Sequence, residues 1–250
     1  VVLSAFGFGG LVYGLSRLGG DGGGDAASMP ASVTWIAFGL GAAGVAAFIW
    51  RQLVLQRRDR ALLDLRTFRS RNFSISVGLM ILLMASLFGT IIVLPYYLQR
   101  VLLLDPLETG LVLLPGGLLM GLLGPLVGRL FDRVGPTPLL VPASVVLSGV
   151  LWAFTMLGES TSVWLVLLAH LIMSAALAFM FTPLFTSALG SVEPRFYSHG
   201  SAIIGTVQQV AGATGTALFI AVMAGQQAAA AAAGAAEIAA RAQGIRGAFL

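Results

Sequence analysis

Long apolar runs alternate with short polar connections along the whole chain. Seven of these runs come close to or exceed the roughly 20 residues that an α-helix needs to cross the hydrocarbon core of a bilayer. The predicted spans are 1–18, 32–50, 73–98, 107–130, 138–157, 163–189 and 201–224. An alanine-rich tract at 225–243 is expected to form an external loop or surface helix. The pattern predicts an all-α integral membrane protein, a polytopic helix bundle with about seven complete transmembrane helices plus the start of an eighth. Because the chain starts and stops inside apolar stretches, it is interpreted as a fragment at both ends.

Glycine stripes mark two of the runs. In the fourth run, four glycines step by four, three and four residues and therefore share one helical face: Gly117, Gly121, Gly124 and Gly128. In lipid, such a stripe lets another helix approach very closely. In the seventh run a similar face carries Ser201, Gly205, Gln208, Gly212 and Gly215. We predict close helix–helix contacts at the glycines of both stripes, from 117 to 124 and from 205 to 215.

Composition supports the membrane interpretation. The chain is 58% hydrophobic and 10% charged, whereas soluble domains carry about 25% charged residues. Its basic residues flank apolar runs instead of forming a face, which argues against a nucleic-acid partner. The chain has no cysteine and two distant histidines, so no metal site and no catalytic dyad is predicted. An intramembrane enzyme is therefore disfavoured, and no cofactor is expected.

Arginine placement predicts the orientation of the spans. Ten arginines fall in alternate connections, at 51–72, at 129–137 and at Arg195, whereas four fall in the opposite set. By the positive-inside rule the first set faces the cytoplasm, and 19–31 and 225–243 face outside.

The basic connection at 51–72 has a pattern of its own. Its latter part, LLDLRTFRSRNF, places Leu62, Leu65 and Phe68 at spacings of three. This spacing suggests a short helix that lies on the membrane surface.

The connection between the fourth and fifth runs carries the string GRLFDRVG at 128–135. Glycine at 135 permits a left-handed turn residue and Pro136 suits the first turn of a helix, so a tight hairpin between membrane helices is predicted. The string resembles the loop signature of the major facilitator superfamily, with which it shares Gly128, Leu130, Asp132, Arg133 and Gly135. It departs at Phe131, a small-residue position, and at 136–137, where basic residues usually follow. Such an ending is expected of the second copy of the motif in these transporters.

The whole chain resembles the fourteen-helix drug:proton antiporter branch of that superfamily. The resembling strings include GGLVYGLSRLG, LPYYLQRVLLLDPLETGLVLLPGG and HGSAIIGTVQQVAGATGTALFIAVMA. The resemblance implies two linker helices at 1–50, a basic cytoplasmic linker at 51–72 and a C-terminal six-helix bundle, lacking most of its last helix, at 73–250. It also implies a multi-pass protein of the inner (cytoplasmic) membrane that exports small hydrophobic or cationic substrates against protons. Its other partners would be the lipid bilayer and the missing N-terminal bundle of the same protein.

Five polar or ionisable residues in the spans are candidates to line a substrate cavity: Thr90, Tyr96, Tyr97, His170 and Gln208. Ionisable groups inside a membrane are candidates for function, yet a neutral hydrogen-bonded histidine at position 170 would serve packing alone. Gln208 would equally line a cavity or hold helices together. The tyrosines would form an interfacial belt or stack on a flat or cationic substrate.

Asp132 has two compatible interpretations. As a loop carboxylate it would cap the next helix, which is favourable by about 0.3–1 kcal/mol. The resemblance implies that Asp132 and Arg133 form part of a cytoplasmic latch that opens during alternating access. All ten acidic residues map to connections or span ends, so the proton-coupling acid is expected in the missing bundle. An exporter of an endogenous lipid or metabolite and a non-transporting membrane scaffold stay open as alternatives.

Overall fold

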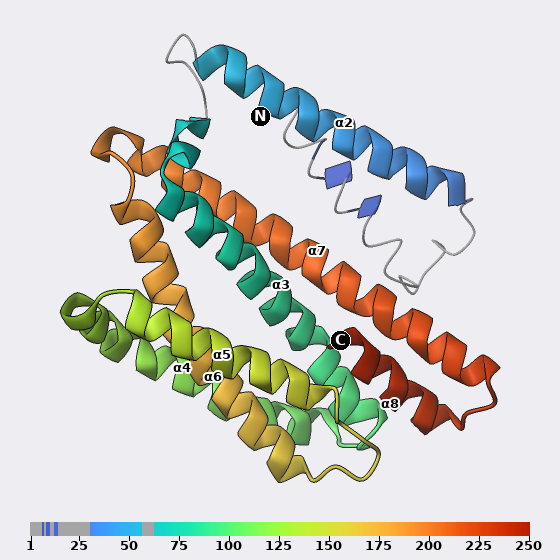
Figure 1. Cartoon of the computed structure of the whole chain (residues 1–250). Helices are drawn as coiled ribbons and strands as arrows, with labels where there is room; N and C mark the ends of the chain where they lie inside the picture. The colour runs from blue at the N-terminus through green and yellow to red at the C-terminus, as the bar shows by residue number, and fades with distance from the viewer. Residues whose placement is uncertain (1–6, 8, 11–12, 15–30, 57–62) are drawn as a thin grey trace. The chain divides into compact units, whose positions relative to one another are not determined.

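The computed structural model describes residues 7, 9–10, 13–14, 31–56 and 63–250. Within this part of the chain the regular elements are helical, and no residue lies in a strand. In chain order (Figure 1) they are α2 Ala31–Gln56, η2 Leu65–Arg69, α3 Arg71–Arg100, α4 Pro106–Val134, α5 Thr137–Phe154, α6 Val163–Gly190, η3 Pro194–Phe196, α7 Tyr197–Ala232 and α8 Glu237–Ala248.

Six helical segments of the described residues are long and apolar enough to cross a membrane. They are Trp35–Gln56, Arg71–Arg100, Pro106–Val134, Thr137–Phe154, Val163–Gly190 and Pro194–Ala232. These segments match six of the predicted spans and confirm the all-α membrane bundle. The remaining predicted span, at 1–18, lies largely outside the described residues, although positions 7, 9–10 and 13–14 are helical.

The alanine-rich tract differs from its prediction. Instead of forming a separate loop or surface helix, it extends α7 without interruption to Ala232. Alanine has the highest helix propensity of all residues, so the tract continues the helix that precedes it. The chain then turns at Gly234, whose φ of 86° lies in the left-handed region that glycine tolerates. The twelve-residue helix α8, Glu237–Ala248, follows this turn; its first half falls within the tract that was predicted as a loop or surface helix, and its second half precedes the predicted start of an eighth span.

The chain divides into two compact units. The first contains Val1–Gly89 and Ser187–Ala221, and the second contains Thr90–Thr186 and Val222–Leu250. α3 and α7 contribute residues to both units, and α4 and α5 belong to the second.

Within the first unit, α3 and α7 lie side by side (Figure 1). Each of the two helices places a phenylalanine ring over a glycine of the other. A Cβ atom added at Gly212 on α7 would stand 2.9 Å from the Phe88 ring of α3, and one added at Gly89 on α3 would stand 2.4 Å from the Phe219 ring of α7. Between these two ring contacts, a Cβ atom added at Gly215 would come within 2.4 Å of the Ala85 Cα atom. The α3–α7 contact therefore depends on glycine at three positions, as close packing of membrane helices generally does.

Candidate functional site

The predicted loop motif forms a tight hairpin between α4 and α5 in the second unit. α4 ends at Val134, and Gly135 closes it with a φ of 77° and an amide that donates to the Phe131 carbonyl oxygen at 2.9 Å. Pro136 is the N-cap residue of α5, which begins at Thr137. The predicted left-handed glycine and the following proline are both confirmed, because this turn is specified by local backbone chemistry.

The structure corrects the predicted capping role of Asp132. This residue lies in the last turn of α4, and α5 has no side-chain hydrogen bond at its N-cap. Among the described residues Asp132 forms no ion pair, although it is exposed beside Arg133. A carboxylate at the negative end of a helix dipole is unfavourable by about 0.3–1 kcal/mol. Local helix stability therefore does not account for an acid at this position.

His170 lies in the first third of α6, against Gly116 of α4. Its Nε2 atom is 3.3 Å from the Leu113 carbonyl oxygen, so this nitrogen donates when it carries the proton. Its Nδ1 atom is buried and has no hydrogen-bond partner among the described residues. A Cβ atom at Gly116 would stand 2.4 Å from Nε2 and 2.6 Å from the Ser174 Oγ atom. Glycine at position 116 thus makes the room that the imidazole occupies.

The glycine stripe predicted on α4 does not make this contact. Added Cβ atoms at its glycines would meet no atom within 4 Å at any of Gly117, Gly121, Gly124 and Gly128. The close approach occurs at Gly116, which is about 100° around the helix from Gly117. On α7, Gly205 has the same open surroundings, whereas Gly212 and Gly215 touch α3. The predicted packing at Gly117, Gly121, Gly124 and Gly205 therefore has no partner within the described residues.

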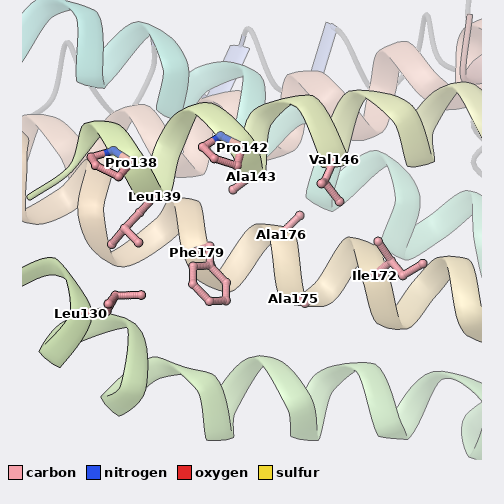
Figure 2. A pocket seen from close by; sticks show the side chains of 10 residues that line it. All are labelled: Leu130, Pro138, Leu139, Pro142, Ala143, Val146, Ile172, Ala175, Ala176 and Phe179. Atoms are coloured by element: carbon pink, nitrogen blue, oxygen red, sulfur yellow. The ribbon is translucent and has the colours of Figure 1, made fainter. Parts of the chain in front are cut away.

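An apolar cavity of about 470 Å³ lies between α4, α5 and α6 of the second unit. Figure 2 shows Leu139, Ala143 and Val146 of α5 facing Ala176 and Phe179 of α6, with Leu130 of α4 at one end. Leu130 and Pro138 connect the cavity to the loop motif. All ten lining side chains are apolar, so the cavity suits a hydrocarbon-rich molecule.

Tyr97 does not line a cavity, contrary to the prediction. It is fully buried, and its hydroxyl donates to the Gly158 carbonyl oxygen at 2.7 Å, which ties the end of α3 to the α5–α6 connection. Thr90 is also buried, and its Oγ1 atom has no hydrogen-bond partner among the described residues. Tyr96 is half-buried, and its hydroxyl lies 3.5 Å from the Gln227 Oε1 atom.

Gln208 lies in the first unit, on the face of α7 that packs against α3. It is half-buried, and its amide donates to the Met80 Sδ atom at 3.2 Å. Thioether sulfur is a weak hydrogen-bond acceptor, so this contact orients the Gln208 amide but leaves part of its hydrogen-bonding capacity unused.

The basic linker folds around an ion pair. Asp64 is the N-cap residue of η2 and accepts from the backbone amide of Arg66 at 2.9 Å. The Arg66 guanidinium also binds the carboxylate at 2.6 Å, and the Asp64 side chain is only 5% exposed. Burial by itself raises the pKa of Asp64, but the hydrogen bonds and charge of Arg66, with a contribution from His199, hold the pKa below its ordinary value of 3.8. A short helix is present at the predicted place, as the 3₁₀ helix η2, whose side chains repeat every three residues. Leu62 lies outside the described residues, and a location on the membrane surface stays a prediction.

Replacing Asp64 by asparagine is expected to lower stability at neutral pH by about 1–2 kcal/mol. Asparagine still caps a helix, so the loss reports the charge that Arg66 binds. Because the folded-state pKa lies below 3.8, the carboxylate stabilises the protein above that pH, and this contribution is lost as pH falls through the folded-state pKa. Thermal unfolding of the purified wild type and variant over this pH range should show the difference in stability closing on acidification.

The matched control is Asp132→Asn, at an exposed acid without an ion pair among the described residues, which should leave stability unchanged or raise it slightly, since it removes a negative charge from the end of α4. A deficit of Asp64→Asn that stays constant with pH would mean that the side chain acts through its shape and not its charge.

Six long apolar helices among the described residues define the chain as part of a polytopic α-helical membrane protein. Residues 1–216 match the sequence profile of the Major Facilitator Superfamily, and the chain belongs to that family. Members of this family are membrane transporters and not enzymes, in agreement with the prediction from the sequence.

Two groups of bacterial relatives carry names that describe resistance. The chain is 36% identical to the lincomycin resistance protein LmrB of Listeria monocytogenes over 229 residues, which cover 91% of the chain and 47% of that relative. The Bacillus subtilis protein of the same name is 36% identical over 227 residues, covering 91% of the chain and 46% of the relative. A multidrug resistance protein B homolog of Mycobacterium tuberculosis is 31% identical over 180 residues, covering 71% and 33%. The chain thus spans about half the length of the first relatives.

Proposed function

We propose that the whole protein is a proton-coupled exporter of hydrophobic or cationic compounds in the cytoplasmic membrane, of the fourteen-helix branch. The observation that carries this proposal is the similarity over 91% of the chain to proteins named for lincomycin resistance. In this proposal 1–50 supply the linker helices, 51–72 the cytoplasmic linker and 73–250 the C-terminal bundle. Transport proceeds by rocking this bundle against an N-terminal bundle around a midplane site.

The surroundings of Asp132 support a latch between bundles. The acid stands exposed at the unfavourable end of α4 without an ion-pair partner among the described residues. A basic group of the other bundle would supply the missing partner in one state of the transporter, and release it in the other. In alternating access, a gate must form its contact in one state of the transporter and break it in the other.

The location of acids supports a proton site outside this chain. The described acidic residues lie at helix ends or in connections: Asp64, Asp105, Glu108, Asp132, Glu159, Glu193 and Glu237. A proton-coupled exporter needs a titratable group that is exposed alternately to the two sides of the membrane. His170 is the ionisable candidate that the sequence offers within a span, and its packing against Gly116 leaves it little freedom to move. We therefore assign the coupling acid to the N-terminal bundle.

The test is lincomycin resistance and dye export by the whole protein in efflux-deficient bacteria, with an imposed pH gradient in inverted vesicles. Export that requires the gradient is expected for the wild type. His170→Gln should keep at least about half of the proton-driven export, as should His199→Gln, the control at the other histidine. A neutral substitute for a buried acid of the N-terminal bundle should abolish it.

Two results would change the proposal. Loss of proton-driven export in His170→Gln, with substrate binding and expression retained, would make the histidine the coupling group. An absence of drug export, together with export of an endogenous lipid, would favour the alternative substrate class, which the apolar cavity between α4, α5 and α6 would also accommodate. An absence of any transport would favour a scaffold.

A further inference from the structure

A polar cavity of about 290 Å³ lies where the basic linker meets the α6–α7 connection in the first unit. Two segments some 120 residues apart in the sequence form its walls. The linker contributes Arg66, Arg69 and Ser70, and the α6–α7 connection contributes Ser191, Arg195 and Phe196 together with one carboxylate, that of Glu193. Three guanidinium groups thus line one small cavity. The positive-inside rule accounts for arginines in these connections, but it does not require them to gather at one cavity.

The two segments that form this cavity are held together by a hydrogen bond and by contacts to one aromatic ring. The Ser70 hydroxyl donates to the Ser191 Oγ atom at 3.1 Å, and Ser191 donates in turn to the Ala188 carbonyl oxygen at 2.8 Å. The Arg66 and Arg195 guanidinium carbons lie 5.3 Å and 4.6 Å from the centroid of the Phe196 ring. Stacking on one ring fixes both cations without neutralising either. A ligand would therefore enter a site that exists before binding.

The cavity carries a surplus of positive charge. Asp64 balances Arg66, and Glu193, which also lines the cavity, pairs with Arg195 at 2.8 Å, both side chains being about two-thirds exposed. The surplus is therefore the charge of Arg69. Arg69 forms no ion pair with any described residue. Guanidinium groups present planar forks of N–H donors that match the oxygens of a phosphate group.

The position of the cavity indicates which phosphate it meets. α3 begins at Arg71, α6 ends at Gly190 and α7 begins at Tyr197, so the cavity lies at the ends of three membrane-spanning helices. The ends of helices that cross the hydrocarbon core reach the headgroup region, where lipid phosphates lie. Phe68 and Tyr197 are exposed nearby, as aromatic side chains at a membrane interface are. Basic pockets of this kind between transmembrane helices bind anionic headgroups.

We propose that this cavity binds the phosphate group of an anionic phospholipid. Arg69 and Arg195 contact the phosphate oxygens, and Arg66, held by Asp64 and stacked on Phe196, adds fixed positive charge. The lipid would bridge the basic linker and the α6–α7 connection at the membrane surface. This proposal does not rest on the proposed transport function.

The test measures lipid retained by the purified whole protein. Wild type and variants are reconstituted in phosphatidylcholine alone or in an equimolar mixture with phosphatidylglycerol, extracted in mild detergent and analysed by native mass spectrometry. Each of Arg69→Gln and Arg195→Gln should weaken phosphatidylglycerol binding about fivefold, and the double variant more. Both side chains lie at the surface, so the variants should fold, and size-exclusion profiles establish this before binding is measured.

Arg71→Gln is the matched control, because Arg71 is an exposed arginine next to the cavity that does not line it. It should bind phosphatidylglycerol like the wild type. If Arg71→Gln lost as much phosphatidylglycerol binding as the cavity variants, the binding would come from general electrostatic attraction to the basic linker. That result would overturn the proposal. A cavity that binds inorganic phosphate with the same dependence on Arg69 and Arg195, but retains no phosphatidylglycerol, would be a site for free phosphate and would also overturn it.

Discussion

Gly215→Ala is expected to reduce the yield of folded protein sharply and to lower its stability by about 3 kcal/mol, the upper end of the usual effect of overpacking. The added Cβ atom would stand 2.4 Å from the Ala85 Cα atom and 2.6 Å from the Ala85 carbonyl oxygen. Both are backbone atoms of a membrane-spanning helix, so no side-chain rotation can relieve the overlap. α3 and α7 would have to move apart and give up the ring contacts on either side. Alanine favours a helix over glycine by about 1 kcal/mol, which is too little to compensate.

Gly205→Ala is the control for this result. Gly205 lies on the same helix, is exposed, and has no atom within 4 Å of an added Cβ. Its substitution by alanine should leave stability unchanged or raise it slightly through helix propensity. Thermal unfolding in detergent, followed by fluorescence-detected size exclusion, compares the two variants. Equal stability of Gly215→Ala and the wild type would contradict the α3–α7 contact.

The glycine stripes illustrate what sequence periodicity can and cannot provide. A period of 3.6 residues places glycines on one face of a helix, but it does not say which neighbour covers that face. On α7 the stripe meets α3 at Gly212 and Gly215, whereas on α4 the contact falls at Gly116 outside the stripe. The partner rings, Phe88 and Phe219, were not identified beforehand because a phenylalanine in an apolar run looks like any other lipid-facing residue.

Local turn chemistry was more predictable than side-chain partners. The left-handed conformation of Gly135 follows from the residue itself and from Pro136 after it, and the structure has both as expected. The role of Asp132 depended on where α4 ends, and the helix includes this residue in its last turn. Tyr97 was misassigned because its acceptor, the Gly158 carbonyl oxygen, lies 61 residues away. The cavity lined by Arg66 and Arg195 likewise joins segments that no sequence spacing relates.

Gly116→Ala is expected to destabilise the protein by about 2–3 kcal/mol and to disturb His170 specifically. The new methyl group would overlap the imidazole Nε2 and Cδ2 atoms, at 2.4 Å and 2.5 Å, and the Ser174 hydroxyl at 2.6 Å. These are side-chain atoms, so the imidazole ring can rotate away from the new methyl group, which backbone atoms cannot do. Rotation breaks the hydrogen bond to the Leu113 carbonyl oxygen and moves a polar ring into apolar surroundings. The predicted loss of stability therefore has two sources: poorer packing between α4 and α6, and a polar ring left without its hydrogen bond.

Gly117→Ala separates these effects from helix propensity, since the neighbouring Gly117 is exposed and an added Cβ meets no atom within 4 Å. This variant should be as stable as the wild type or slightly more so, while Gly116→Ala unfolds at a lower temperature. A second comparison isolates the histidine. In a His170→Ala background the space beside Gly116 is vacated, so most of the cost of Gly116→Ala should disappear, and the two substitutions should be strongly non-additive. Additive effects, or a Gly116→Ala variant as stable as Gly117→Ala, would show that His170 does not pack against this glycine and is free to move within the membrane.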